Sequence, residues 1–281
     1  MTTAAAAHAD ELPRELRVGC VRYLNSRPLI HGHEARVTFQ HPATLADELA
    51  AGRLDVGLVP TFELLRQPAN YRVVDDVAIA CRGRVYSVFL AYRGHLADVR
   101  RIWLDPASRT SVNLLRVLLA EFHGYQPQYA PLPPASDAPP LAAPAPGEGV
   151  LLIGDQAIAF RTQQTQTAAG CRFFDLGEQW QLATGLPFVF AAWLVRAGVP
   201  RAPLVADALR AWRQAGSDRR EAIIAAAEAT GQYPEGFPEF YLTRCIRYRL
   251  GADEKKAIAE YARLLHAHGL IDAVPAQLSW L

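Results

Sequence analysis

The chain has 281 residues, of which 51% are hydrophobic and 20% are charged. This length fits one large domain or two lobes, and this composition excludes an intrinsically disordered chain. The formal net charge is only +1, and no basic stripe of the kind that binds nucleic acid is present, so we expect no nucleic-acid partner.

Features that would direct the chain to a membrane or an oxidising compartment are missing from the sequence. No stretch reaches the roughly 18 apolar residues that a membrane helix needs. Residues 1–10 are rich in alanine, but they lack the basic start and apolar core of a secretory signal. The four cysteines are far apart and form no CxxC pair, which favours free thiols over two disulfides. We therefore expect a cytoplasmic protein without membrane association.

Strands and helices alternate in the first third of the chain. Residues 1–14 are predicted to be a frayed tail, followed by short strands at 17–21 and 37–39. A helix is predicted over 44–52, because Thr44 can cap it, leucines repeat at i, i+4, and Gly52 suits a left-handed stop. A buried strand over 54–60 follows. This strand–helix–strand order is typical of parallel α/β architecture.

The remaining two thirds continue this pattern up to a helical end. Further strands are predicted at 85–92, 102–104, 150–153 and 188–195. An amphipathic helix should follow residues 105–111, because Leu115, Leu118, Leu119 and Phe122 repeat at helical spacing. The Pro-rich segment 131–149 is predicted to be an extended surface loop inside a second lobe, in preference to a boundary between domains. Helices are predicted near 202–215, 218–230 and 253–269.

Together, these elements predict two α/β lobes with a central cleft, as in the type II periplasmic-binding-protein-like fold. Residues 1–92 and 188–281 would form the first lobe, with the helical end packed back onto it. Residues 93–187 would form the second lobe as an insertion. The long apolar strands at 85–92 and 188–195 would cross between the lobes, and a ligand would occupy the cleft.

The sequence contains no motif that signals a metal or a cofactor. It has no GxGxxG, Walker loop, GxSxG or HExxH pattern, and we expect no redox cofactor. The pairs His31-x-His33 and His266-x-His268 could bind a metal only with ligands from elsewhere, and such spacing is ordinary on a protein surface. We therefore expect neither a metal nor an organic cofactor.

Polar residues do follow several of the predicted strands. In open α/β sheets, ligands bind beyond the carboxyl ends of the strands. The candidate positions are Asn25, Ser87, Ser108, Arg109, Thr110, Ser111 and Asp155. The group at 108–111 begins a helix, where unpaired N–H groups and hydroxyls can hold a carboxylate or phosphate.

Each of these candidates also has a purely structural interpretation. Asn25 could cap a helix, Asp155 could stabilise a turn, and Ser87 could be a satisfied buried hydroxyl. One of the hydroxyls at 108–111 could simply cap the helix that they begin.

Seven stretches together resemble a family of menaquinone-biosynthesis enzymes of the futalosine route, which includes chorismate dehydratase and a sister enzyme that makes dihydroxynaphthoate. They are VRYLNSRPLI (21–30), LDVGLVPTFELL (54–65), VYSVFL (85–90), LDPASRTSVNLLRVLL (104–119), LLIGDQAI (151–158), DLGEQWQLATGLPFVFAAWLV (175–195) and YLTRCIRYRLGADEKKAIAEYARLL (241–265). The YLN-x-x-PL and SRTS elements are more similar to the dehydratase branch.

The resemblance implies that chorismate, a dicarboxylate, loses water to give 3-(1-carboxyvinyloxy)benzoate, a lyase reaction without a cofactor. Asn25 and Ser87 would then be catalytic, with Asn25 donating a hydrogen bond to the departing hydroxyl and Ser87 binding either a carboxylate or the same hydroxyl. Ser108, Thr110 and Ser111 would hold a substrate carboxylate, and Asp155 would bind the ring hydroxyl or hold other cleft groups. No histidine lies in a matching cleft motif, so the substrate's own carboxylate is the candidate base.

Two alternatives stay open. The chain could be the sister enzyme that makes dihydroxynaphthoate, or a non-catalytic protein of the same fold that binds a small carboxylate. The sequence leaves the general base and the oligomeric state undetermined.

Overall fold

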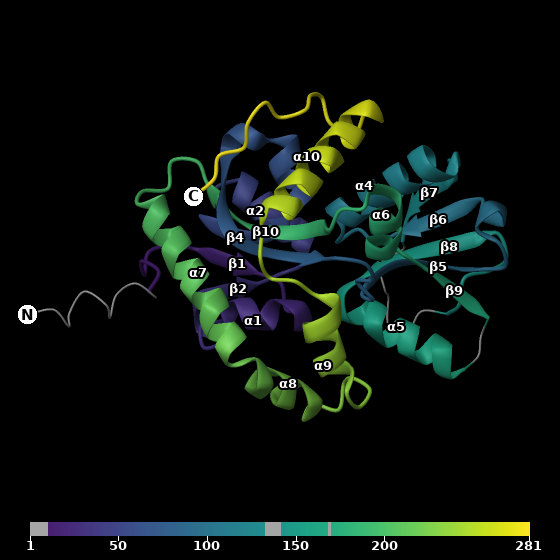
Figure 1. The fold of residues 1–281 in the computed structure, drawn as a ribbon, viewed down its shortest axis with the longest axis horizontal. Coiled ribbons are helices and arrows are strands. Elements are labelled where there is room, and N and C mark those ends of the chain that lie inside the picture. The colour runs from purple at the N-terminus through teal and green to yellow at the C-terminus, as the bar shows by residue number, and fades with distance from the viewer. Residues whose placement is uncertain (1–10, 133–141, 168–169) are drawn as a thin grey trace, which may run out of the picture.

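The computed structural model describes residues 11–132, 142–167 and 170–281 (Figure 1). These residues form two five-stranded sheets that lie side by side, each accompanied by helices. The strands of the first sheet are, in spatial order, β2 (Val37–Phe39), β1 (Val18–Cys20), β3 (Val56–Pro60), β10 (Phe188–Arg196) and β4 (Tyr71–Cys81). Those of the second are β7 (Gln128–Pro131), β6 (Arg101–Leu104), β8 (Glu148–Ile153), β5 (Val88–Arg93) and β9 (Cys171–Asp175).

Both sheets follow the same plan. The first three strands of each are parallel, and the fourth, β10 or β5, runs antiparallel to both of its neighbours. Each of these fourth strands is the one that the chain forms on arrival from the other sheet, after residues 82–87 for β5 and after residues 185–187 for β10. The alternation of strand and helix therefore predicted the parallel part of each sheet but not its antiparallel members.

The two long apolar strands were expected to cross between the lobes, but each of them stays within one sheet. β5 pairs only with β8 and β9, and β10 pairs only with β3 and β4. The crossings are the short segments that precede these strands, and they lie close together because Cys81 pairs with Phe188. Residues 88–92, which the prediction assigned to the first lobe, belong to the second sheet. We therefore propose that the boundary between the lobes lies within 82–87.

Helices flank both sheets. They are α1 (Arg27–Ile30), α2 (Pro42–Ala50), α3 (Thr61–Arg66), α4 (Arg109–Val117), α5 (Gly154–Gln166), α6 (Leu176–Thr184), α7 (Ala202–Asp218), α8 (Arg220–Glu228), α9 (Phe237–Phe240) and α10 (Ala252–Ala267). Four 3-10 turns, η2 (Leu24–Ser26), η3 (Glu34–Arg36), η4 (Pro68–Asn70) and η5 (Leu96–Asp98), and two π-helical turns, η6 (Leu118–Phe122) and η7 (Tyr241–Cys245), complete the described elements.

The long helices after residue 200 pack mainly on the side of the first sheet. α7 packs against β4 and α1, and α10 packs against β10 and also reaches α4 beside the second sheet (Figure 1). α7 approaches α1 so closely that a Cβ at Gly216 would lie 1.7 Å from the carbonyl oxygen of Pro28. The chain end adds two backbone bonds at Val73, to Ser279 and Leu281. This packing places η7 beside the junction of the sheets.

Local predictions differ from the structure at several boundaries. The helix predicted over 44–52 begins at Pro42 with His41 at its N-cap, so Thr44 lies inside it and caps nothing. The loop predicted over 131–149 overlaps a strand at each end: β7 ends at Pro131, and β8 begins at Glu148. Its central residues 133–141 and most of the predicted N-terminal tail lie outside the described residues. All four cysteines are free thiols.

Candidate functional site

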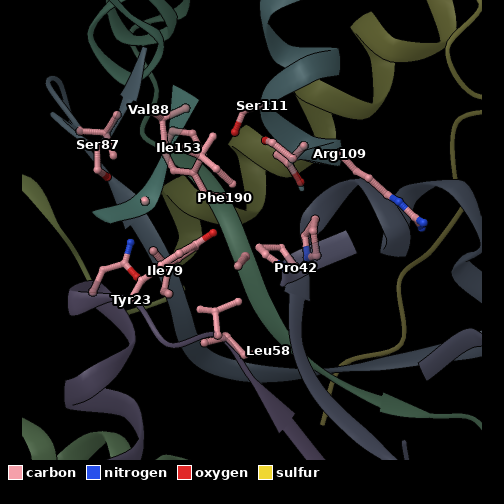
Figure 2. A pocket seen from close by; sticks show the side chains of 18 residues that line it. Tyr23, Pro42, Leu58, Ile79, Ser87, Val88, Arg109, Ser111, Ile153 and Phe190 are labelled. Carbon is pink, nitrogen blue, oxygen red and sulfur yellow. The ribbon is translucent and has the colours of Figure 1, made fainter. Parts of the chain in front are cut away.

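A cavity lies between the two sheets (Figure 2). Val21, Leu58, Ile79 and Phe190 line it from the first sheet and its connections, and Val88 and Ile153 line it from the second. The wall is therefore largely apolar. It is formed by both halves of the molecule, that is, by the first sheet and the second sheet with the segments attached to each.

The polar part of the wall comes from chain segments that follow strands or connect the sheets. It consists of Tyr23, Asn25, Ser87, Ser108, Arg109, Thr110 and Ser111. Asn25 follows β1, and residues 108–111 follow β6. Because the carboxyl ends of parallel strands form one edge of a sheet, each sheet presents these residues at its cleft side. Of the predicted site residues, the structure brings all but Asp155 to this wall.

Asn25 is not a helix cap. It lies in the middle of the 3-10 turn η2, whose N-cap is Tyr23, and it is only 8% exposed. Its amide Nδ2 donates a hydrogen bond to the hydroxyl of Tyr241 at 3.1 Å. Its Oδ1 is buried and has no hydrogen-bond partner among the described residues. A buried acceptor without a partner costs about 1–3 kcal/mol, so this oxygen is suited to receive a ligand donor.

Ser87 lies in the segment that crosses from the first sheet to the second. Its side chain is fully buried, and its Oγ is 2.6 Å from the hydroxyl oxygen of Tyr241. The backbone before it is held by Asp175, whose carboxylate accepts hydrogen bonds from the N–H groups of Val85 and Tyr86. Tyr86 has φ 67°, a left-handed conformation that is strained for an aromatic residue. This bend places the serine hydroxyl beside Asn25 and Tyr241.

The hydroxyls at the start of α4 occupy different positions in the structure. Ser108 is the N-cap residue, but its side chain makes no capping hydrogen bond. The hydroxyl of Thr110 accepts a hydrogen bond from the N–H of Phe62 at 3.1 Å, and so joins α4 to α3 beside the first sheet. Ser111 is 4% exposed and lines the cavity (Figure 2). The helix start therefore offers hydroxyls and backbone N–H groups, as an anion site requires.

The charge of Arg109 is directed away from the cavity (Figure 2). Its guanidinium donates to Glu63 at 2.7 Å and to Asp47 at 2.6 Å, both on the side of the first sheet. Glu63 is fully buried and also accepts from Arg66 at 2.7 Å. Arg109 therefore connects the two halves rather than presenting a positive charge to the cavity.

Asp155, at the start of α5, does not line the cavity. Its carboxylate accepts hydrogen bonds from the N–H of Leu24 at 3.0 Å and from the hydroxyl of Tyr233 at 3.0 Å. Burial raises the pKa of Asp155, while the bonds from Leu24 and Tyr233 act in the opposite direction. Next to it, Gly154 has φ +68°, and a Cβ there would lie 2.7 Å from the ring of Tyr23. The two halves are therefore in close contact at this point.

Several residues that organise the site were not predicted from the sequence. Tyr241 bridges Asn25 and Ser87, and Asp175 holds the crossing segment. Asp105 accepts from the N–H of Ala107 at 2.8 Å, and burial raises the pKa of its carboxyl. The contacts of Tyr241 with Asn25 and Ser87 join residues up to 216 positions apart, so no local pattern could have revealed them. Only the placement of Asp105 and Asp175 directly after or at the end of a strand was a usable signal.

The residues that the structure describes contain no group of three His, Cys, Asp or Glu side chains that could hold a metal ion. One histidine of each pair makes another contact. The ring of His33 stacks on Trp212 with 4.2 Å between the ring centroids, and Nε2 of His268 lies 2.9 Å from Oε2 of Glu121. Within the same residues, no helix is long and apolar enough to cross a membrane.

Comparison with known sequences connects this chain to one pathway. A family model described as menaquinone biosynthesis matches residues 16–267. A chorismate dehydratase of Thermus thermophilus is 34% identical over 88% of this chain and 94% of that protein. A chorismate dehydratase of Campylobacter jejuni is 23% identical over 88% of this chain and 92% of that protein.

Comparison with solved structures concerns the fold alone, because all identities are low. A protein of Archaeoglobus fulgidus has a TM-score of 0.69 at 15% identity, covering 93% of this chain and 100% of that one. The alkanesulfonate-binding protein of Xanthomonas axonopodis pv. citri, solved with MOPS, has a TM-score of 0.63 at 18% identity, covering 96% and 97%. A Candida albicans protein described as having the generic periplasmic-binding-protein fold has a TM-score of 0.62 at 11% identity, covering 94% and 92%. The predicted two-lobed, periplasmic-binding-protein-like fold is confirmed.

Proposed function

The chain belongs to the menaquinone biosynthesis family, and from that membership together with its cavity we propose that it dehydrates chorismate to 3-(1-carboxyvinyloxy)benzoate. The observation that carries the proposal is the pairing of Asn25 and Ser87 in a largely apolar cavity that residues of both sheets line. The similarity to two chorismate dehydratases over most of the chain supports the same reaction.

The dehydration of chorismate requires few catalytic groups from the protein. In chorismate, the C–O bond of the ring alcohol and the C–H bond on the neighbouring ring carbon break, and a third ring double bond forms. The hydroxide and the proton leave together as water, and the enol ether is kept. Because the product ring is aromatic, the driving force comes from the substrate. The enzyme has to orient the molecule, exclude bulk water and assist the departing hydroxyl.

Asn25 and Ser87 are suited to the departing hydroxyl. The unpartnered Oδ1 of Asn25 can accept the hydrogen of this hydroxyl and so orient its oxygen. The second amide hydrogen of Asn25 and the hydroxyl hydrogen of Ser87 can then donate to the oxygen as negative charge develops on it. A positioned donor to such an oxygen typically contributes about 2.7–4 kcal/mol to the barrier.

The start of α4 is suited to a substrate carboxylate. Ser108, Thr110 and Ser111 place hydroxyls at the first turn of a nine-residue helix, where the helix dipole favours negative charge. Asp155 would act indirectly, by holding Leu24 and hence the turn that carries Asn25. This role is the second of the two that the sequence analysis considered for Asp155.

The cavity wall also bears on the identity of the base. Among the described residues that line it, no side chain is a carboxylate, an imidazole, an amine or a thiol. Burial raises the pKa of Tyr23, with nearby Asp105 and Asp155 adding to the effect, so this phenol keeps its proton at neutral pH. We therefore propose that a carboxylate of chorismate itself removes the ring proton.

The proposal is tested by incubating the purified protein with chorismate and following the products by liquid chromatography and mass spectrometry. We expect an aromatic product that is one water lighter than chorismate, at a rate well above that of a protein-free control. The Asn25→Ala and Ser87→Ala variants should be at least about a hundredfold slower. Chorismate that binds but is recovered unchanged would instead indicate a binding protein of this fold.

A further inference from the structure

Tyr241 is a buried tyrosine whose hydroxyl joins the two catalytic candidates. It begins η7, directly after α9, and is 1% exposed. Its hydroxyl oxygen accepts a hydrogen bond from Asn25 at 3.1 Å and lies 2.6 Å from the Oγ of Ser87. Tyr241 itself does not line the cavity. It is therefore placed behind Asn25 and Ser87, where it can affect them without touching a ligand.

The direction of these hydrogen bonds follows from counting hydrogens. A tyrosine hydroxyl has one hydrogen, and the Asn25 bond uses only its oxygen as an acceptor. Ser87 is the one further hydrogen-bond partner of this hydroxyl among the described residues, so the Tyr241 hydrogen is directed to Ser87. If Ser87 were the donor instead, the buried hydrogen of Tyr241 would have no acceptor. Ser87 therefore keeps its own hydrogen free for a ligand.

The position of this hydroxyl is fixed by aromatic packing. The Tyr241 ring stacks on Phe237 at 5.5 Å with an interplanar angle of 15°. Phe237 in turn packs against Tyr86, next to Ser87, and stacks with Tyr233, the partner of Asp155. Burial raises the pKa of Tyr241 well above its ordinary value, so its hydroxyl keeps its hydrogen throughout the neutral range.

We propose that Tyr241 is a positioning residue, which fixes the amide of Asn25 and directs the hydroxyl hydrogen of Ser87 into the cavity toward the departing hydroxyl. This inference rests on the proposed function, because it assigns the readout to dehydration. Asn25 follows β1 of the first sheet, Ser87 lies in the segment that crosses to the second sheet, and Tyr241 begins η7 near the end of the chain. The bridge therefore assembles a catalytic pair that neither sheet could hold by itself.

The first test is the near-isosteric variant Tyr241→Phe. Removing the hydroxyl frees the Asn25 amide and lets Ser87 rotate, so kcat should fall about ten- to hundredfold while KM changes less than about threefold. The matched control is Tyr248→Phe, because the Tyr248 hydroxyl is buried and has no hydrogen-bond partner among the described residues. That control should keep wild-type kcat. An unchanged kcat in Tyr241→Phe would overturn the inference.

Double variants separate a positioning role from a general loss of stability. If Tyr241 acts through Ser87 and Asn25, then adding Tyr241→Phe to Ser87→Ala should reduce kcat by a smaller factor than in the wild type, because only its effect through Asn25 remains. The same holds, with the roles of Ser87 and Asn25 exchanged, when it is added to Asn25→Ala. If instead the single effects multiply in full, Tyr241 acts independently of both residues and the inference fails.

A measurement without turnover keeps the inference separate from the proposed function. The side-chain amide protons of Asn25, observed by NMR in selectively labelled protein, should be protected from exchange in the wild type and in Tyr248→Phe. They should shift and lose protection in Tyr241→Phe. Unaltered amide signals in Tyr241→Phe would contradict the bridge, whereas a wild type that leaves chorismate intact would contradict the proposed function.

Discussion

Replacing Asn25 by aspartate tests the proposed chemistry with almost no change of shape. The amide now donates to Tyr241 at 3.1 Å, and an ionised carboxylate cannot donate at all. The Tyr241 hydroxyl would then donate its hydrogen bond to the new carboxylate. It would no longer donate to Ser87, whose Oγ lies 2.6 Å from the Tyr241 hydroxyl oxygen. The departing hydroxyl would thus lose both donors that we assign to it, beside a new negative charge.

The magnitude follows from the loss of donors in a closed site. One lost donor to a developing oxyanion costs about 2.7–4 kcal/mol, which lowers the rate about a hundred- to thousandfold. We therefore expect Asn25→Asp to lower kcat by at least about a hundredfold at neutral pH. Asn25→Ala should lower it similarly. If Asn25 were only a helix cap, aspartate would replace it without loss, because both residues cap helices well.

The pH dependence of Asn25→Asp provides an internal check. Burial raises the pKa of the nearby carboxyls Asp105 and Asp155, and it should do the same for a carboxyl at position 25. A protonated carboxyl can donate again, so the deficit of this variant relative to the wild type should shrink as the pH falls. The assay is steady-state formation of the aromatic product across pH, with thermal unfolding as the folding control. Near-normal turnover at neutral pH would refute the assignment of Asn25.

Three further predictions concern the wall and its supports. Thr110→Val with Ser111→Ala should raise KM about tenfold, since each hydroxyl contributes about 0.5–1.5 kcal/mol; unchanged substrate binding would remove the helix start from the site. Arg109→Gln should raise KM by about tenfold, because it removes the ion pair with Glu63 that joins the two halves. Its control is Arg66→Gln, since Arg66 binds the same Glu63 carboxylate within one half; this variant should lower only the unfolding temperature. Because burial raises the pKa of Asp155, the folded chain binds the proton of this carboxyl more tightly than the unfolded chain does. The free energy of unfolding, measured by urea titration, should therefore fall as the pH rises from about 4 through the raised pKa. The Asp155→Asn variant should not show this fall.

The sequence predicted those features that depend on local patterns. Apolar runs identified β3, β8 and β10, and the residues placed after strands, Asn25 and Ser108–Ser111, do line the cavity. β4 escaped prediction although it has eleven residues, because two consecutive aspartates interrupt its apolar pattern. These aspartates are matched by cations far away in the sequence: Asp75 by Lys255, and Asp76 by Arg213 and Arg249.

The functional meaning of the predicted residues depended on contacts that a sequence does not display. Asn25 had the pattern of a helix cap, yet its amide is occupied by Tyr241 from the opposite end of the chain. Asp155 was expected either to bind the ring hydroxyl or to hold other cleft groups, and its contact with the backbone of Leu24 across the junction of the halves favours the second role. In both cases residue type and position after a strand were sufficient to locate the site, and only tertiary packing could define the partner.

The charge distribution of the cavity is consistent with a substrate that supplies its own base. A dianion would be held most tightly by arginine or lysine, yet the described wall contains one cation, Arg109, and its guanidinium is engaged by Glu63 and Asp47. A cation beside the carboxylate that removes the proton would lower its pKa and weaken it as a base. Hydroxyls and the N–H groups of a helix start can orient a carboxylate while placing no full positive charge beside it. The same polarity suits the departing hydroxyl, because neutral donors at Asn25 and Ser87 become more effective only as negative charge develops there.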